Sequence, residues 1–123
     1  MMMKNLARTV YALFGVLGVA LGLLALVKPE LALRPGDANG LTTHLLREEG
    51  ALGVFLGLMA FWCFTHFEER RPVHFALLVF AALFSLIHWR EYLLDNRSIG
   101  SPLANSVPLL LLAVTAPYKP LPR

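Results

Sequence analysis

The sequence is poor in charge and nearly free of cysteine, and each shortage excludes a class of protein. Charged residues make up 15% of its 123 residues, whereas hydrophobic residues make up 57%. An ordinary soluble domain carries about 25% charged residues, and a chain this short has too little interior to bury so much apolar surface. We therefore expect lipid, rather than a water-surrounded core, to cover most of it. Cys63 is the only cysteine, which excludes an intrachain disulfide.

The sequence motifs of several functional classes are also missing. No run of lysine and arginine interleaved with aromatic residues occurs, so nucleic acid is not an expected partner. The chain has no phosphate-binding loop, no dinucleotide fingerprint and no serine–histidine–acid set in a nucleophile context. These absences favour a protein without catalytic activity, and we predict no cofactor.

Four apolar segments, separated by short polar connections, dominate the sequence. The first has nineteen uncharged residues, which as a helix measure about 28 Å, close to the hydrocarbon thickness of a bilayer. A secretory signal is the alternative for this segment, but its apolar region is usually about 7–15 residues, and no A-x-A-like cleavage site follows. The pattern predicts an all-α protein, an integral-membrane antiparallel four-helix bundle that forms a single domain over 1–123. The expected spans are 9–27, 50–67, 72–89 and 102–117, and Pro108 predicts a kink in the last.

Lysine and arginine are slightly more frequent on one side of this arrangement. Six lie on the side that carries both ends of the chain and five lie on the other. The positive-inside rule then predicts cytoplasmic termini for a multi-pass protein of the bacterial inner membrane. The six are Lys4, Arg8, Arg70, Arg71, Lys119 and Arg123.

An eleven-residue pattern occurs twice, at 15–25 and at 50–60. The two copies match in eight of eleven positions, and each contains Gly-x-x-Gly-x-x-x-Gly. Spacings of three and four place the glycines on one helical face, and small faces let membrane helices approach closely. We predict that the first two helices pack through these faces; the alternative is that leucine and glycine are simply common in membrane helices. The six glycines are Gly15, Gly18, Gly22, Gly50, Gly53 and Gly57.

Ionisable side chains concentrate where the second span begins and the third ends, on the side opposite the termini. Such groups are costly at membrane depth, so they usually pair or face a cavity. We predict a cross-helix arginine–carboxylate pair there; the alternative is that the side chains are simply solvated at the interface. The two expected pairs are Arg47 with Glu91 and Arg90 with Glu48. Solvation is favoured for Glu49, Asp95 and Arg97. The predicted polar cluster consists of Arg47, Glu48, His88, Arg90, Glu91 and Asn105.

Two histidine–glutamate pairs make a metal site a minor alternative. His44 and Glu48 are four residues apart, and His88 and Glu91 are three apart, so each pair shares a helical face. Di-metal carboxylate bundles use the reverse order, Glu-x-x-His, with additional carboxylates. The mismatch favours no metal and leaves these four residues as weak candidates. Haem ligation by His88 or His74 is no better supported, and His74 is expected at the cytoplasmic interface.

The order of these features resembles that of a known family. Arg47-Glu48-Glu49-Gly50 opens the second span, Arg70-Arg71-Pro72 precedes the third, and Arg90 closes it. Over residues 8–117 this layout is similar to that of small bacterial four-helix integral-membrane proteins of unknown function, DoxX-like in general layout. The matching positions are Arg47, Gly50 and Arg90. The resemblance implies the four-helix fold and no established catalytic activity.

Two functions fit these observations, and a third is less favoured. The first is a non-catalytic accessory or structural subunit of a larger membrane complex, or a self-associating bundle. Its expected partners are the lipid bilayer and either another membrane protein or a second copy of the chain. The alternative is binding of a lipid, a quinone or another small amphiphile at the polar cluster. A metal-dependent membrane enzyme comes third.

Overall fold

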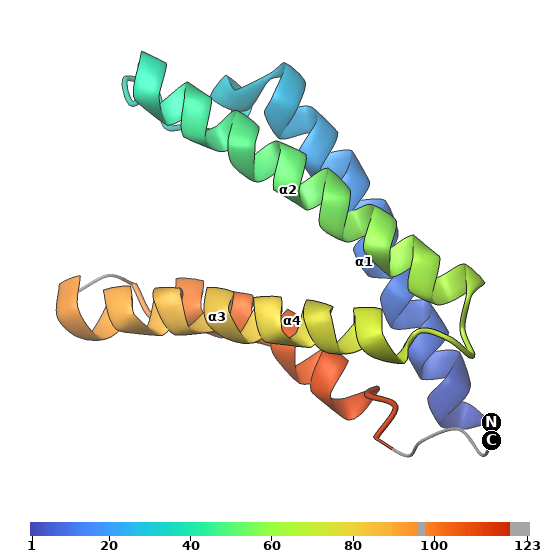
Figure 1. Cartoon of the computed structure of the whole chain (residues 1–123). Coiled ribbons are helices and arrows are strands. Elements are labelled where there is room, and N and C mark those ends of the chain that lie inside the picture. The colour runs from blue at the N-terminus through green and yellow to red at the C-terminus, as the bar shows by residue number, and fades with distance from the viewer. Residues whose placement is uncertain (96–97, 119–123) are drawn as a thin grey trace. The chain divides into compact units, whose positions relative to one another are not determined.

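The computed structural model describes residues 1–95 and 98–118, and most of these residues are helical (Figure 1). The described residues form four α-helices and one short 3-10 helix, and they contain no strand. The all-α prediction is therefore confirmed for the part of the chain that the structure describes. The elements are α1 (Met2–Val27), η1 (Pro29–Ala32), α2 (Gly40–Thr65), α3 (Arg71–Asp95) and α4 (Gly100–Val114).

Three of the helices are long and apolar enough to cross a membrane, namely α1, α2 and α3. They contain 26, 26 and 25 residues, and thus measure about 38 Å each, more than the ~30 Å of bilayer hydrocarbon. α1 and α2 begin seven and ten residues before the spans expected from the sequence, and α3 ends six residues after its expected span, whereas α2 ends two residues before the expected end. α4 has 15 residues and measures about 22 Å, so it is a shorter apolar helix.

The chain divides into two compact units, and α1 contributes to both. The first comprises Tyr11–Thr65 and is called the glycine unit below. The second comprises Met1–Val10 and His66–Arg123 and is called the terminal unit. Each unit is described by itself, and the single four-helix bundle over 1–123 stays a prediction.

In the glycine unit, α1 and α2 run side by side in opposite directions (Figure 1). A Cβ atom added to Gly18 would lie 2.9 Å from the Cα atom of Gly57. A Cβ atom added to Gly22 would lie 2.6 Å from the carbonyl oxygen of Gly50. Since real Cβ atoms do not approach other atoms so closely, only glycine lets these two backbones meet. Residues of increasing number in α1 contact residues of decreasing number in α2, so the two helices are antiparallel.

The connection from η1 to α2 explains where α2 begins. Gly36 has a φ of 95°, which glycine adopts without strain, and the Asp37 amide donates to the Arg34 carbonyl at 3.1 Å. Pro35 before Gly36 suits this turn because its φ is already fixed. Asn39 then caps the helix: its Oδ1 accepts from the Thr42 amide at 2.9 Å, and the Thr42 hydroxyl accepts from the Asn39 amide at 3.0 Å.

In the terminal unit, α3 and α4 form the second antiparallel pair. His74 contacts Leu112, and farther along α3 Ser85 contacts Ser106. Residue numbers that rise in α3 meet falling numbers in α4, which defines the antiparallel order. Buried Pro102 lies in the first turn of α4, a position that helices tolerate, whereas Pro108 lies inside the helix and cannot donate to the carbonyl four residues before it.

Candidate functional site

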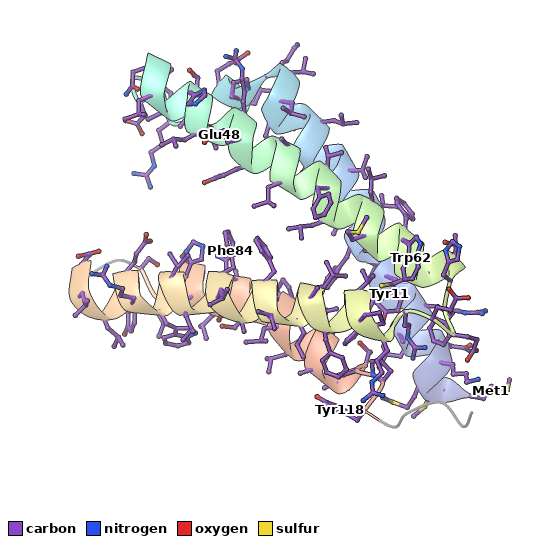
Figure 2. The ribbon with its side chains drawn as sticks, in the orientation of Figure 1. Met1, Tyr11, Glu48, Trp62, Phe84 and Tyr118 are labelled. Atoms are coloured by element: carbon purple, nitrogen blue, oxygen red, sulfur yellow. The ribbon has the colours of Figure 1, made fainter. Side chains whose placement is uncertain are left out.

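The residues of the predicted polar cluster belong to two different units. Arg47 and Glu48 lie on α2 in the glycine unit, and both are exposed. Glu48 pairs within its own helix, because its Oε1 lies 3.2 Å from Nε2 of His44, with both side chains about two-thirds exposed (63% and 66%). Glu48 is labelled on α2 in Figure 2. The cross-helix arginine–carboxylate pair stays a prediction. The remaining members, in the terminal unit, are His88, Arg90, Glu91 and Asn105.

Two of those members meet at a serine in the first turn of α4. The Ser101 hydroxyl lies 3.0 Å from Nδ1 of His88, and Nδ2 of the Asn105 side chain donates to the Ser101 backbone carbonyl at 2.9 Å. The Phe84 ring packs edge-on against the His88 ring, with centroids 4.9 Å apart. Arg90 is exposed and Glu91 is partly exposed. The structure therefore brings His88 and Asn105 together, through a residue that the sequence analysis did not single out.

Four residues farther along α4, Ser106 lies at the centre of a second polar group. Its hydroxyl donates to the Pro102 carbonyl at 2.7 Å. A hydroxyl has one proton, so Ser106 must then accept from the Ser85 hydroxyl at 2.8 Å and from Nε1 of Trp89 at 2.9 Å. Ser85 is buried, and Trp89 is partly buried. These bonds join α3 to α4 and give the Ser85, Trp89 and Ser106 side chains hydrogen-bond partners.

A third polar contact closes the C-terminal end of α4. Nε2 of His74, a fully buried side chain, lies 3.0 Å from the Leu112 carbonyl oxygen, and a carbonyl only accepts, so Nε2 carries the proton. The Thr115 hydroxyl donates to the Leu111 carbonyl at 2.7 Å, and the Tyr118 hydroxyl donates to the Ala113 carbonyl at 2.9 Å. The last carbonyls of a helix have no partner inside it, so these side chains supply one.

Two of the four weak metal candidates contact each other, since His44 lies beside Glu48. A third candidate, His88, contacts Ser101. Over residues 1–95 and 98–118, no three or more histidine, cysteine, aspartate or glutamate side chains lie close enough to hold one ion. The pairing of His44 with Glu48 is thus the four-residue contact that any exposed helix permits.

The hydrogen bond between Ser101 and His88 has the length expected of a nucleophile and its base, which prompts a comparison with hydrolases. A catalytic base of this kind is itself oriented by a third group, usually a carboxylate. Among the described residues, the His88 ring contacts the Ser101 hydroxyl and the Phe84 ring, and neither is an acid. The contact therefore resembles a structural hydrogen bond between helices.

Sequence reasoning did not single out Ser85 or Ser106, and it gave His74 no contact with α4; these three residues carry contacts between α3 and α4. The available signal was weak: Ser85 and Trp89 are four apart on α3, which places a hydroxyl and an indole on one face of an apolar helix. His74 was expected at the cytoplasmic interface, which stays a prediction, and its side chain is fully buried. A single histidine gives no sign of a partner 38 residues away.

Comparisons of the chain with protein-family models, with curated proteins and with solved structures give no match. The resemblance to DoxX-like proteins therefore stays a prediction.

Proposed function

We propose that the chain is a small, non-catalytic integral-membrane protein that serves as an accessory or structural subunit of a larger membrane assembly, or that associates with itself. The observation that carries this proposal is how little of each long helix the chain covers. Only 22% of the most apolar stretch of α1, of α2 and of α3 is buried. Lipid or other membrane helices are needed to cover the rest.

The uncovered side chains in the terminal unit are large and aliphatic. Leu83 is 58% exposed, Leu86 is 63% exposed and Leu110 is 61% exposed. Large side chains, with Phe84 on α3 among them, project from the helices (Figure 2). The glycines of α1 and α2 already contact each other, so the surface left for a partner is rich in leucine and valine. Such a surface supports packing against lipid chains or against another membrane helix.

The proposal includes cytoplasmic termini in a bacterial inner membrane. Contacts within the terminal unit support the placement of both termini on the same side of that membrane. The ammonium group of Lys4 lies 3.8 Å from Glu68, so the start of α1 lies beside the turn before α3. Tyr118 packs against Phe75 with ring centroids 6.2 Å apart, so the segment after α4 returns to the same end. The basic side chains at this end follow the positive-inside rule. They are Lys4, Arg8, Arg70 and Arg71; Lys119 and Arg123 lie outside the described residues.

Binding of a lipid, quinone or other amphiphile at the polar cluster is the second candidate function. The convergence of His88 and Asn105 on Ser101 supports it, because pockets for small molecules use a few converging polar groups. His88→Gln and Asn105→Ala together are expected to remove such binding. Unchanged recovery of bound amphiphile from that variant would reject this candidate.

Cysteine crosslinking in native membranes tests the first proposal. The background is Cys63→Ala, which removes the only native thiol. On it, Leu110→Cys carries a thiol at a position that is 61% exposed, and the matched control Leu112→Cys carries one at a position that is 2% exposed. We expect a bifunctional thiol reagent to link the Leu110 variant, and not the Leu112 variant, to a second copy or to another membrane protein.

Two results would contradict the proposal. Release of the chain from membranes by alkaline carbonate would show that it is not an integral-membrane protein. Retention in the membrane, with no linked species from Leu110→Cys or from the equally exposed Leu86→Cys, would show that lipid alone covers these helices.

A further inference from the structure

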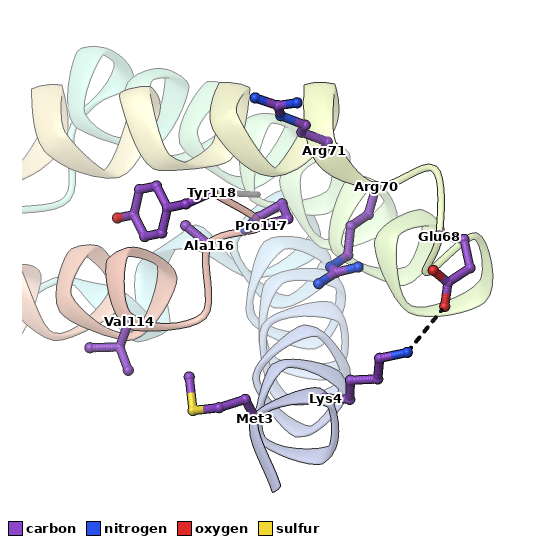
Figure 3. A pocket seen from close by; sticks show the side chains of 9 residues that line it. All are labelled: Met3, Lys4, Glu68, Arg70, Arg71, Val114, Ala116, Pro117 and Tyr118. Carbon is purple, nitrogen blue, oxygen red and sulfur yellow. Dashed lines mark ion pairs between the residues drawn. The ribbon is translucent and has the colours of Figure 1, made fainter. Parts of the chain in front are cut away.

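A basic pocket opens at the end of the terminal unit where both described ends of the chain meet (Figure 3). Its volume is about 450 Å³, within the range of about 300–1,000 Å³ that small-molecule sites occupy. Three segments line it: the first turns of α1, the turn from α2 into α3, and the residues after α4. None of these segments belongs to the predicted polar cluster.

The pocket is lined by three cations and one carboxylate. Lys4 comes from α1, Arg70 lies in the turn before α3, and Arg71 is the first residue of α3. The carboxylate is that of Glu68, in the same turn. Lys4 lies 3.8 Å from Glu68, and both side chains are about two-thirds exposed, so water screens this pair and it is weak. A stronger anion can therefore compete with Glu68 for the lysine.

Arg70 is held in place before any ligand arrives. Its guanidinium lies 3.6 Å above the Phe67 ring and donates to the Phe67 carbonyl, and Phe67 is 4% exposed. Arg8 lies over the same ring at 4.9 Å. Figure 3 shows the Arg70 side chain reaching from the turn toward α1. Two guanidinium groups around one buried ring raise the local positive potential, and an arginine fixed by stacking loses less entropy when it binds a phosphate.

The remaining wall of the pocket is apolar and continues onto the membrane-facing surface. Met3 is 48% exposed, Val114 is 59% exposed and Tyr118 is 62% exposed. The Tyr118 hydroxyl donates to the Ala113 carbonyl, which holds its ring beside the pocket. Tyrosine is common at the interfaces of membrane proteins. A free phosphate ion needs no such wall, whereas an amphiphile has chains to lay against it.

We propose that this pocket binds the phosphate headgroup of an anionic phospholipid, with the three basic side chains around the phosphate and the acyl chains along the apolar wall beside α4. The site lies where α1 begins and α3 starts, at the headgroup level of a membrane crossed by those helices. The proposal rests on the membrane insertion proposed above. The shared chemistry is a phosphate oxyanion, and inorganic phosphate is the other source that the experiment must separate.

The test reconstitutes the full chain in nanodiscs of equal dioleoylphosphatidylglycerol and dioleoylphosphatidylcholine, then releases it and counts the retained lipids by native mass spectrometry. We expect the retained lipid to be enriched in phosphatidylglycerol. The pocket variant is Lys4→Gln with Arg71→Gln, and the matched control is Lys28→Gln with Arg34→Gln, which removes the same charge from exposed positions in the glycine unit. Arg70 is left intact because it stacks on buried Phe67.

The pocket variant is expected to lose at least about fivefold of the enrichment, the effect of a single basic residue near a membrane surface, while the control stays within about twofold of the unaltered protein. A second pair of variants removes a carboxylate instead of basic groups, and the expected change in lipid enrichment for the pocket residue is an increase. Glu68→Gln removes the carboxylate beside Lys4 and should raise the enrichment, whereas Glu69→Gln, its exposed neighbour outside the pocket lining, should not.

Each remaining outcome is decisive. Equal losses in the pocket variant and the control would assign the enrichment to general charge and overturn the proposal. Abolition of the enrichment by excess inorganic phosphate, with phosphate itself retained by the protein, would make the pocket a free-phosphate site and overturn the lipid assignment. A chain that fails to stay with the nanodisc at all would instead contradict membrane insertion, so the two failures are distinguishable.

Discussion

α1 and α2 meet through their backbones, whereas α3 and α4 meet through hydrogen-bonded side chains. In the first pair, the Cα of Gly57 lies 2.9 Å from the position that a Cβ on Gly18 would take. In the second pair, the Ser85, Trp89 and Ser106 side chains bridge the gap. Hydrocarbon around a helix removes the hydrophobic drive for association, and close packing and polar bonds are the two means that remain. α1 and α2 use close packing, and α3 and α4 use hydrogen bonds.

The two kinds of helix contact differ in how they tolerate substitutions. Backbone contact leaves no space for an added methyl group, so the glycine pair should fail through overlap. The hydrogen-bonded side chains between α3 and α4 can shift, so a substitution there should cost only the hydrogen bonds that it removes. The comparison therefore predicts large, position-dependent losses in the glycine unit and smaller, graded losses in the terminal unit.

The largest effect is expected from Gly22→Ala in α1. Its Cβ would lie 2.6 Å from both the Gly50 carbonyl oxygen and the Val54 amide nitrogen, and backbone atoms cannot rotate away. We expect a loss of about 1–3 kcal/mol in the free energy of unfolding, the range for overpacked interiors. Denaturant titration of the protein in detergent micelles, followed by circular dichroism, measures it.

The matched control for this substitution is Gly53→Ala in α2. The nearest atom to its added Cβ is the Gly22 Cα at 3.4 Å, which is ordinary van der Waals contact. Alanine also favours a helix over glycine by about 1 kcal/mol, so this variant should be neutral or slightly more stable. Equal destabilisation by the two substitutions would show that the helices do not meet as described.

A smaller effect is expected from Ser106→Ala in α4. The change leaves the Trp89 indole and the Ser85 hydroxyl without the acceptor they share. Hydrogen bonds between membrane helices contribute about 1 kcal/mol, so we expect a loss of about that size. Ser98→Ala is the control, because Ser98 is exposed and its hydroxyl accepts a 3.3 Å hydrogen bond from the Gly100 backbone amide two residues away. A loss above that expected for Gly22→Ala would reverse the comparison.

How far the sequence predicted this structure depends on whether the signal is local. Spacings of three and four are properties of one helix, so the shared face of Gly15, Gly18 and Gly22 was visible in the chain itself, and so were the apolar lengths of α1, α2 and α3. Ser106 gave no such signal, because its partner Ser85 is 21 residues away and a lone serine has no period. The pocket was hidden for the same reason, since it draws on three separate segments.

The smallest effect is expected at the start of α2, where the polar cluster was predicted. Glu48 pairs with His44 one turn earlier, and both side chains are mostly exposed. Such a pair contributes about 0.3–0.5 kcal/mol, so Glu48→Gln and His44→Gln should show a coupling of at most that size in a double-mutant cycle. The same cycle with Glu48→Gln and Arg90→Gln tests the predicted cross-helix pair. Coupling of about 1 kcal/mol or more there would establish an ion pair between the second and third helices, and strict additivity would leave Glu48 with His44 alone.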